Sequence, residues 1–101
     1  MLRGMRDIII LRELHEKPMH GYALITMFRR RFGVYLGPSS MYPRLEVLER
    51  KGYVVGEWSF SEGKPRKIYR LTPLGEQFLE EGRKGITIAV QPILLAFSVG
   101  V

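Results

Sequence analysis

Cysteine is absent from this chain of 101 residues, and histidine and aspartate are scarce, with two histidines and Asp7 as the single aspartate. The lack of cysteine excludes disulfides, thiolate zinc sites and thiol nucleophiles. A zinc site needs three or four converging ligands, and a serine nucleophile needs a histidine–acid relay. His15 and His20, on either side of Pro18, provide neither arrangement. We therefore expect no metal, no cofactor and no enzymatic activity.

A long hydrophobic run near the start of the chain is also missing. The apolar segment Ile8–Leu11 is followed at once by Arg12 and Glu13, which makes it too short for the core of a secretory signal. We therefore expect a cytoplasmic protein. The length leaves room for one domain with a thin core, so self-association is the expected support for the fold.

Acidic residues are outnumbered, with ten Asp and Glu against sixteen Lys and Arg, giving a net charge of +6 and an isoelectric point near 10. Such a surplus suits a nucleic acid or an acidic membrane surface, although charge alone fits an ordinary basic protein equally well. The run Arg29–Arg31 has two readings of equal weight. Cations at a helix C-terminus complement its dipole, and they also suit DNA.

Three segments show the apolar periodicity of amphipathic helices: about 3–16, about 20–31, and a third that follows Gly37-Pro38. In the third, Ser39 or Ser40 is suited to cap the helix, and Pro43 fits only in its first turn. Apolar residues at 41, 45 and 48 define its inward face. The outward face is expected to hold Ser39, Ser40, Tyr42, Pro43, Arg44 and Val47.

Two strands are predicted next, over 53–60 and 66–72, joined by a turn-rich basic connection. They form a hairpin with a protruding tip. Trp58 and Phe60 are expected in the core or covering the base of the hairpin, with an aromatic ligand platform as the less favoured alternative. Thr72 and Pro73 are expected to start a fourth helix.

The predicted order is helix, helix, helix, hairpin, helix, which is the plan of a winged helix-turn-helix domain of mainly α (α+β) class with a two-stranded β wing. The third helix fits the DNA major groove, and its first N–H groups can bind a phosphate. The cations of the hairpin tip can neutralise phosphates. Tyr42 is expected to bind a phosphate through its hydroxyl, or else to pack on the supporting helix. His20 is expected at a helix start, touching the DNA backbone. Glu46 and Arg50 can pair along the third helix.

Several runs carry a resemblance to a known family: HGY at 20–22, FG at 32–33, SSMYPRLEVLERKGYV at 39–54 and GKPRKIYRLTPLGEQFL at 63–79. Together, over roughly residues 5–82, the sequence resembles the PadR-like family of winged helix-turn-helix transcriptional regulators. The resemblance implies a dimeric repressor acting on a roughly palindromic DNA operator, relieved in several members by a small-molecule effector. Some relatives hold flat aromatic ligands between paired tryptophans at the dimer interface, a mode that the single Trp58 does not support.

The resemblance also implies which residues contact duplex DNA. The recognition-helix set is Ser39, Ser40, Tyr42, Pro43 and Arg44, and the wing set is Gly63, Lys64, Arg66 and Lys67. His20 and Tyr22 are expected to contact the DNA backbone.

The last seventeen residues, 85–101, contain no charged residue. We expect the winged domain to span 1–84 and this apolar segment to form a dimerisation element, with a break near Val90 because Pro92 interrupts helix geometry. Family members usually have a long charged helix here, so the family's dimer geometry does not carry over directly. Two alternatives stay open, packing on the chain's own domain and a membrane anchor, although a spanning helix needs about 20 apolar residues. The alternative functions are a protein–protein interaction module and a membrane-tethered regulator.

Overall fold

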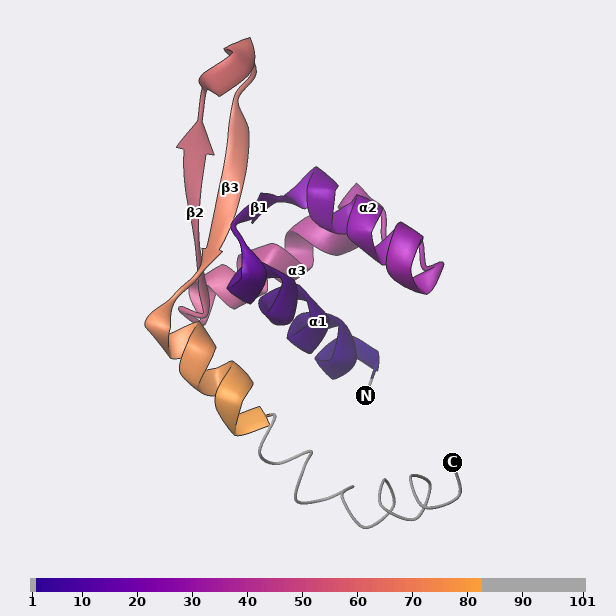
Figure 1. Ribbon diagram of the computed structural model, residues 1–101, viewed down its shortest axis with the longest axis vertical. Helices are drawn as coiled ribbons and strands as arrows, with labels where there is room; N and C mark the ends of the chain where they lie inside the picture. Colours follow the sequence, from indigo (N-terminus) through magenta and orange to yellow (C-terminus); the bar gives the residue numbers. More distant parts are fainter. Residues whose placement is uncertain (1, 83–101) are drawn as a thin grey trace.

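The computed structural model describes residues 2–82, which form a helical body with a projecting β-hairpin (Figure 1). The elements in chain order are α1 (Leu2–Glu16), β1 (Met19–His20), α2 (Gly21–Phe32), α3 (Pro38–Arg50), β2 (Val54–Ser59), a 3₁₀ turn (Ser61–Gly63) and β3 (Arg66–Leu71). Residues 73–82 form a further helix that reaches the last described residue. The predicted winged helix-turn-helix order is confirmed.

The sheet is antiparallel with strand order β1-β3-β2, and β3 is its central strand. The hairpin register pairs Val54 with Leu71 and Ser59 with Arg66, while β1 pairs Met19 with Tyr69. The expected two-stranded wing therefore has a third, short strand at its base. β1 was not predicted because its two residues are too few to show the alternation of apolar and polar side chains by which strands are recognised in a sequence.

One hydrophobic core joins the three helices to the base of the hairpin. Its members come from α1, α2, α3, the loop before α3 and the sheet: Ile10, Leu11, Leu14, Leu24, Ile25, Met27, Phe28, Leu36, Met41, Leu45, Leu48, Val54 and Tyr69. The predicted inward face of α3 is confirmed, because residues 41, 45 and 48 are all buried. This core fixes α3 against α2 and leaves the opposite face of α3 toward solvent.

The start of α3 differs from the expectation. Gly37 is the N-cap, in extended conformation and without a side-chain cap, and Pro38 occupies the first turn, where its missing N–H costs nothing. The predicted caps Ser39 and Ser40 are therefore wrong, since both lie inside the helix. For the same reason Pro43 lies beyond the first turn, within the helix.

Thr72 starts the helix at 73–82 as expected. Its hydroxyl oxygen accepts a hydrogen bond from the Gly75 N–H at 3.0 Å and donates one to the Gly52 carbonyl at 2.5 Å. Thr72 thus ties the end of the hairpin to the chain segment that leaves α3. Helix α2 ends at Gly33, which adopts the left-handed conformation with φ 65°, as glycine does at many helix ends.

Two aromatic residues of the hairpin, Trp58 and Phe60, are not in the core. Trp58 is 62% exposed and Phe60 is 70% exposed, so their expected core placement is wrong. The hairpin extends beyond the helices (Figure 1), and residues 57, 58 and 60 are exposed there. In the helix at 73–82, Phe78 stacks on Tyr53 with ring centroids 4.5 Å apart.

The predicted apolar segment 85–101, with its dimerisation role and its break near Val90, lies outside the described residues. Within residues 2–82, no helix combines the length and apolar character that a bilayer crossing requires.

Candidate nucleic-acid interface

The exposed half of α3, the start of α2 and the outer half of the hairpin form the candidate interface. Figure 1 shows α3 crossing the body beside α2, with the hairpin projecting from the end where α3 stops. On α3, the side chains of Ser39, Ser40 and Pro43 are exposed, as the sequence predicted. These small polar and rigid residues form a surface that a duplex groove could approach without displacing any other part of the fold.

Tyr42 lies where α3 approaches α2. It is 40% exposed, and its ring sits against the backbone of Gly21, where an added Cβ would lie 2.4 Å from a ring carbon. The ring therefore packs on the first residue of α2, as one of the two readings expected. The contact of its hydroxyl with a phosphate stays a prediction.

Arg44 does not lie on the outward face, so that part of the expectation is wrong. Its Nε donates to Asp7 Oδ1 at 3.1 Å and its Nη2 bonds to Asp7 Oδ2, a bidentate pair that is stronger than a single contact. The hydrogen bond with Asp7 raises the pKa of Arg44 despite its partial burial. The guanidinium joins α3 to α1, a contact between two helices that no pattern within α3 could have shown.

The hairpin tip presents exposed cations. Lys64 and Arg66 are exposed, and Gly63 has φ 76°, a left-handed conformation that glycine adopts without strain. The tip therefore has the shape and charge that the wing assignment predicted.

Lys67, the fourth expected wing residue, is instead bound to α3. Its Nζ lies 3.0 Å from Glu49 Oε1, and Glu49 Oε2 accepts the Gly56 N–H at 3.1 Å. Burial alone would raise the pKa of Glu49, but the bonds from Lys67 and Gly56 outweigh it and lower that pKa. The hydrogen bond to Glu49 likewise raises the pKa of Lys67. Glu49 thus connects α3 to both strands, and Lys67 is already neutralised.

A shallow depression lies between α3 and β3, lined by Glu46, Glu49, Arg50 and Lys67. The expected pair along α3, Glu46 with Arg50, is not among the ion pairs of residues 2–82. The two acidic residues of α3 therefore differ in their contacts. Glu49 holds the hairpin, while Glu46 remains exposed at the edge of the depression.

His20 and Tyr22 lie together at the junction of β1 and α2. Their rings stack with centroids 6.4 Å apart, and Tyr22 is 65% exposed. Burial lowers the pKa of His20, and the nearby charge of Arg66 lowers it further. Both effects favour the neutral form of the His20 imidazole. The structure brings these two residues to the Arg66 side of the hairpin.

The second histidine, His15, belongs to no group of potential metal ligands among the described residues. His15 Nδ1 of α1 lies 3.7 Å from Glu76 Oε1 of the helix at 73–82. Among the described residues, no three His, Cys, Asp or Glu side chains come together as a metal site would require.

Comparison with known proteins gives one consistent family. The profile of the "Transcriptional regulator PadR-like family" matches residues 10–81. The transcriptional regulator Rv3488 of Mycobacterium tuberculosis is 33% identical over 85 residues, which cover 84% of this chain and 78% of that protein.

Solved structures agree with this result. A PadR family transcription regulator from Clostridium difficile is 30% identical, with a TM-score of 0.78 and coverage of 91% of this chain and 96% of that one. The structure of Bacillus subtilis PadR in complex with operator DNA is 27% identical, with a TM-score of 0.68, covering 74% of this chain and 44% of that chain.

Proposed function

Because this chain belongs to the PadR-like family of transcriptional regulators, we propose that it is a sequence-specific repressor that binds duplex DNA as a homodimer. The observation that carries the proposal is the exposed polar face of α3 beside a hairpin whose tip holds the exposed cations Lys64 and Arg66. The solved PadR of Bacillus subtilis bound to operator DNA supports the same partner for this chain.

In the proposed complex, α3 enters the major groove with Ser39, Ser40, Tyr42 and Pro43 toward the bases. Base edges are read from the first turns of such a helix. Lys64 and Arg66 bind phosphates on the adjacent backbone, with Gly63 allowing the tip to approach closely. His20 and Tyr22 contact the backbone at the start of α2. Such phosphate contacts position the protein, and base contacts give it specificity.

The role of Arg44 is indirect in this proposal. Its guanidinium is bound to Asp7, so a contact with a base would require the pair to break. We infer that Arg44 holds α3 at a fixed angle on α1, and that Ser40 is the better candidate for reading bases. Lys67, bound to Glu49, similarly fixes the hairpin on α3 instead of contacting phosphate.

A dimer follows from the function, since a palindromic operator offers two equivalent half-sites to two copies of one chain. The apolar stretch 85–101 is the proposed dimerisation element, following a winged domain over residues 1–84. A small-molecule effector would act by changing the spacing of the two α3 helices. As a DNA-binding regulator, the protein is proposed to act in the cytoplasm without a membrane partner.

The proposal is tested by titrating labelled duplex DNA, after selecting bound fragments from a random library. Lys64→Gln with Arg66→Gln should weaken binding to all sequences and flatten the salt dependence by about 0.9 per lost phosphate contact. Ser40→Ala should relax sequence preference with a smaller loss of total affinity. Lys67→Gln is the matched control for Arg66→Gln, since both lie in β3, and it should change the salt dependence less because Lys67 is bound to Glu49.

Absence of any salt-sensitive complex with duplex DNA would reject the repressor. In that case, the exposed Trp58 and Phe60 on the hairpin would favour the alternative of a protein–protein interaction module.

A further inference from the structure

The three consecutive arginines at the end of α2 have different surroundings. Arg31 Nη1 lies 2.5 Å from Glu13 Oε2, and its guanidinium is 5.9 Å from the Phe32 ring centroid. Arg29 and Arg30 are exposed. Within residues 2–82 they have no ion pair or hydrogen bond. Within the described residues, Arg29 and Arg30 therefore present unpaired guanidinium groups to solvent, whereas the guanidinium of Arg31 is paired with Glu13.

Arg29 and Arg30 continue the face of α2 that begins at Tyr22. Positions 22, 26, 29 and 30 follow the spacing of one helix face. Tyr22, Arg29 and Arg30 are exposed, with Thr26 half-buried between them. The buried residues of α2 are Gly21, Leu24, Ile25, Met27 and Phe28. One continuous solvent face thus runs from a residue beside the hairpin to two free cations.

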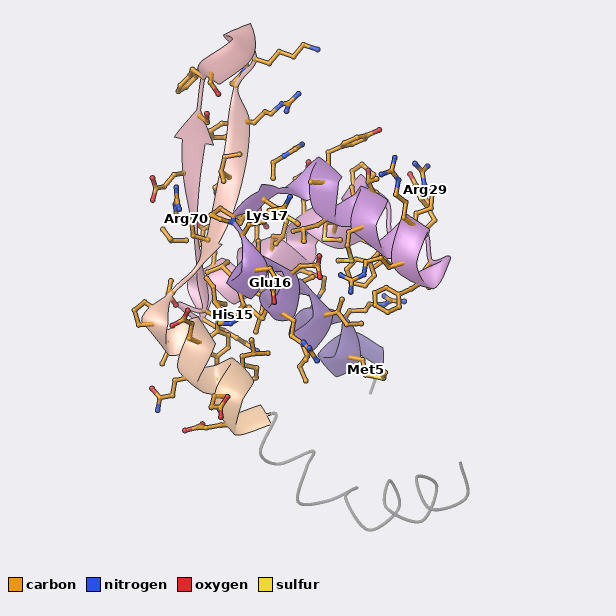
Figure 2. The ribbon with its side chains drawn as sticks, in the orientation of Figure 1. Met5, His15, Glu16, Lys17, Arg29 and Arg70 are labelled. Atoms are coloured by element: carbon orange, nitrogen blue, oxygen red, sulfur yellow. The ribbon has the colours of Figure 1, made fainter. Side chains whose placement is uncertain are left out.

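The length of α2 suits the width of a DNA groove. Its 12 residues span about 18 Å, whereas the major groove is about 12 Å wide. Figure 2 shows Arg29 on α2, well away from the hairpin. With α3 in the groove and α2 across it, the two ends of α2 can reach opposite sugar-phosphate walls.

We propose that Arg29 and Arg30 bind backbone phosphates on the flank of the DNA site opposite the one that the hairpin contacts. This inference rests on the proposed function and extends the protein's footprint to a second phosphate strand. A guanidinium presents a planar fork of N–H donors that matches phosphate oxygens. Neither arginine has to give up a carboxylate partner to make that contact, unlike Arg31, Arg44 or Lys67.

The first test compares two double variants that lose equal charge. Arg29→Gln with Arg30→Gln should make the plot of log association constant against log salt shallower by about 1.8, because each lost phosphate contact removes about 0.9. The affinity lost between 50 and 200 mM salt should then shrink about twelvefold. Arg12→Gln with Arg31→Gln removes the same two charges from α1 and from the Glu13 pair, and should leave the slope near that of the wild type.

The two proposals fail in different ways. A wild-type protein without salt-sensitive duplex binding rejects the proposed function together with this inference. A slope that flattens for Lys64→Gln with Arg66→Gln, but not for Arg29→Gln with Arg30→Gln, rejects only the second flank. Equal flattening by the Arg12 and Arg31 pair also rejects it, because general electrostatics would then explain the effect.

A second measurement does not depend on the glutamine variants being folded. Because the chain has no cysteine, Arg30→Cys or Lys64→Cys introduces a unique site for an iron–EDTA label that cleaves nearby DNA. Within each half-site, the label at 30 should cut on one side of the α3 contact and the label at 64 on the other side. Cleavage by both labels on the same flank, or none from the label at 30, overturns the inference.

Discussion

Gly75 is a residue for which the structure leaves no room for a side chain. An added Cβ would lie 2.1 Å from the Tyr53 carbonyl oxygen and 2.6 Å from Leu71 Cδ1, and a backbone oxygen cannot move aside cheaply. We therefore expect Gly75→Ala to lower the free energy of unfolding by about 1–3 kcal/mol, although alanine is the better helix former. Urea unfolding measures this change. Gly4→Ala in α1, where no atom lies within 4 Å, is the control and should be neutral or stabilising.

The Asp7–Arg44 pair is a second test at the residue scale. The two side chains are only 14% and 24% exposed, so Asp7→Asn leaves a partly buried guanidinium without its carboxylate. Breaking a buried ion pair destabilises a protein more than breaking an exposed one. Because the two side chains keep some contact with water, we expect Asp7→Asn to lower the free energy of unfolding by about 1–2 kcal/mol. Thermal unfolding is the measurement.

Its matched control is Glu57→Gln, which removes the partner of Arg70 in a pair that is 3.8 Å long and more than half exposed. The free energy of unfolding of Glu57→Gln should stay within about 0.5 kcal/mol of the wild-type value. An equal loss in both variants would contradict a structural role for Asp7.

Individual site residues were only partly predictable from the sequence. Ser39, Ser40, Lys64 and Arg66 are exposed as expected, because helix and hairpin periodicity decides which side of an element faces solvent. Arg44 was placed wrongly because its partner Asp7 lies 37 residues away, and pattern within one helix cannot show a contact between two helices.

At the scale of elements, Glu49 controls how the hairpin sits on α3. Its hydrogen bonds with Lys67 and Gly56 hold its pKa below the ordinary 4.5. The stabilisation is therefore fully present above about pH 4.5 and is lost as the pH falls through the lowered pKa of the folded state. We expect acidification below that range to destabilise the wild type more than Glu49→Gln.

Melting temperatures recorded across this pH range give the comparison. Glu46→Gln removes the same charge from the exposed face of the same helix, so it should follow the wild-type acid profile. A Glu49→Gln acid profile that parallels the wild-type profile would show that the bonds of Glu49 with Lys67 and Gly56 contribute nothing to stability.

The elements themselves were largely predictable. Three helices, the hairpin and the Thr72 cap follow from apolar periodicity and turn chemistry, which act locally. The start of α3 was misjudged because two good signals compete there, and the preference of Pro38 for a first turn outweighs serine capping. β1 was missed because its two residues are a strand only by pairing with β3.

At the scale of the whole molecule, an exposed apolar side chain on the helix at 73–82 offers a test of the proposed dimer. Leu74 is 49% exposed. If residues 2–82 were the whole folded unit, Leu74→Ser should change stability by no more than about 0.5 kcal/mol. We expect instead a weaker dimer, seen as a sedimentation coefficient that falls at low protein concentration.

A melting temperature that depends on protein concentration would accompany this effect, since association stabilises the folded state by mass action. Phe60→Ser is the matched control, because Phe60 is an exposed apolar residue on the hairpin, remote from that helix. Equal sedimentation of the wild type and Leu74→Ser at all concentrations would place Leu74 outside any dimer interface.

The hairpin is held on the helical body at several levels, by Thr72 on Gly52 at its base, by Glu49 on Gly56, and by Glu49 on Lys67 near its outer end. Six residues in each strand give it a length of about 20 Å, and its tip extends beyond Lys67, the outermost of these contacts. A rotation of about five degrees at the root displaces the far end by about 2 Å, which is two-thirds of the length of a hydrogen bond. Loosening these contacts together would allow such a tilt, and a shift of that size at the tip decides whether a cation reaches its anion.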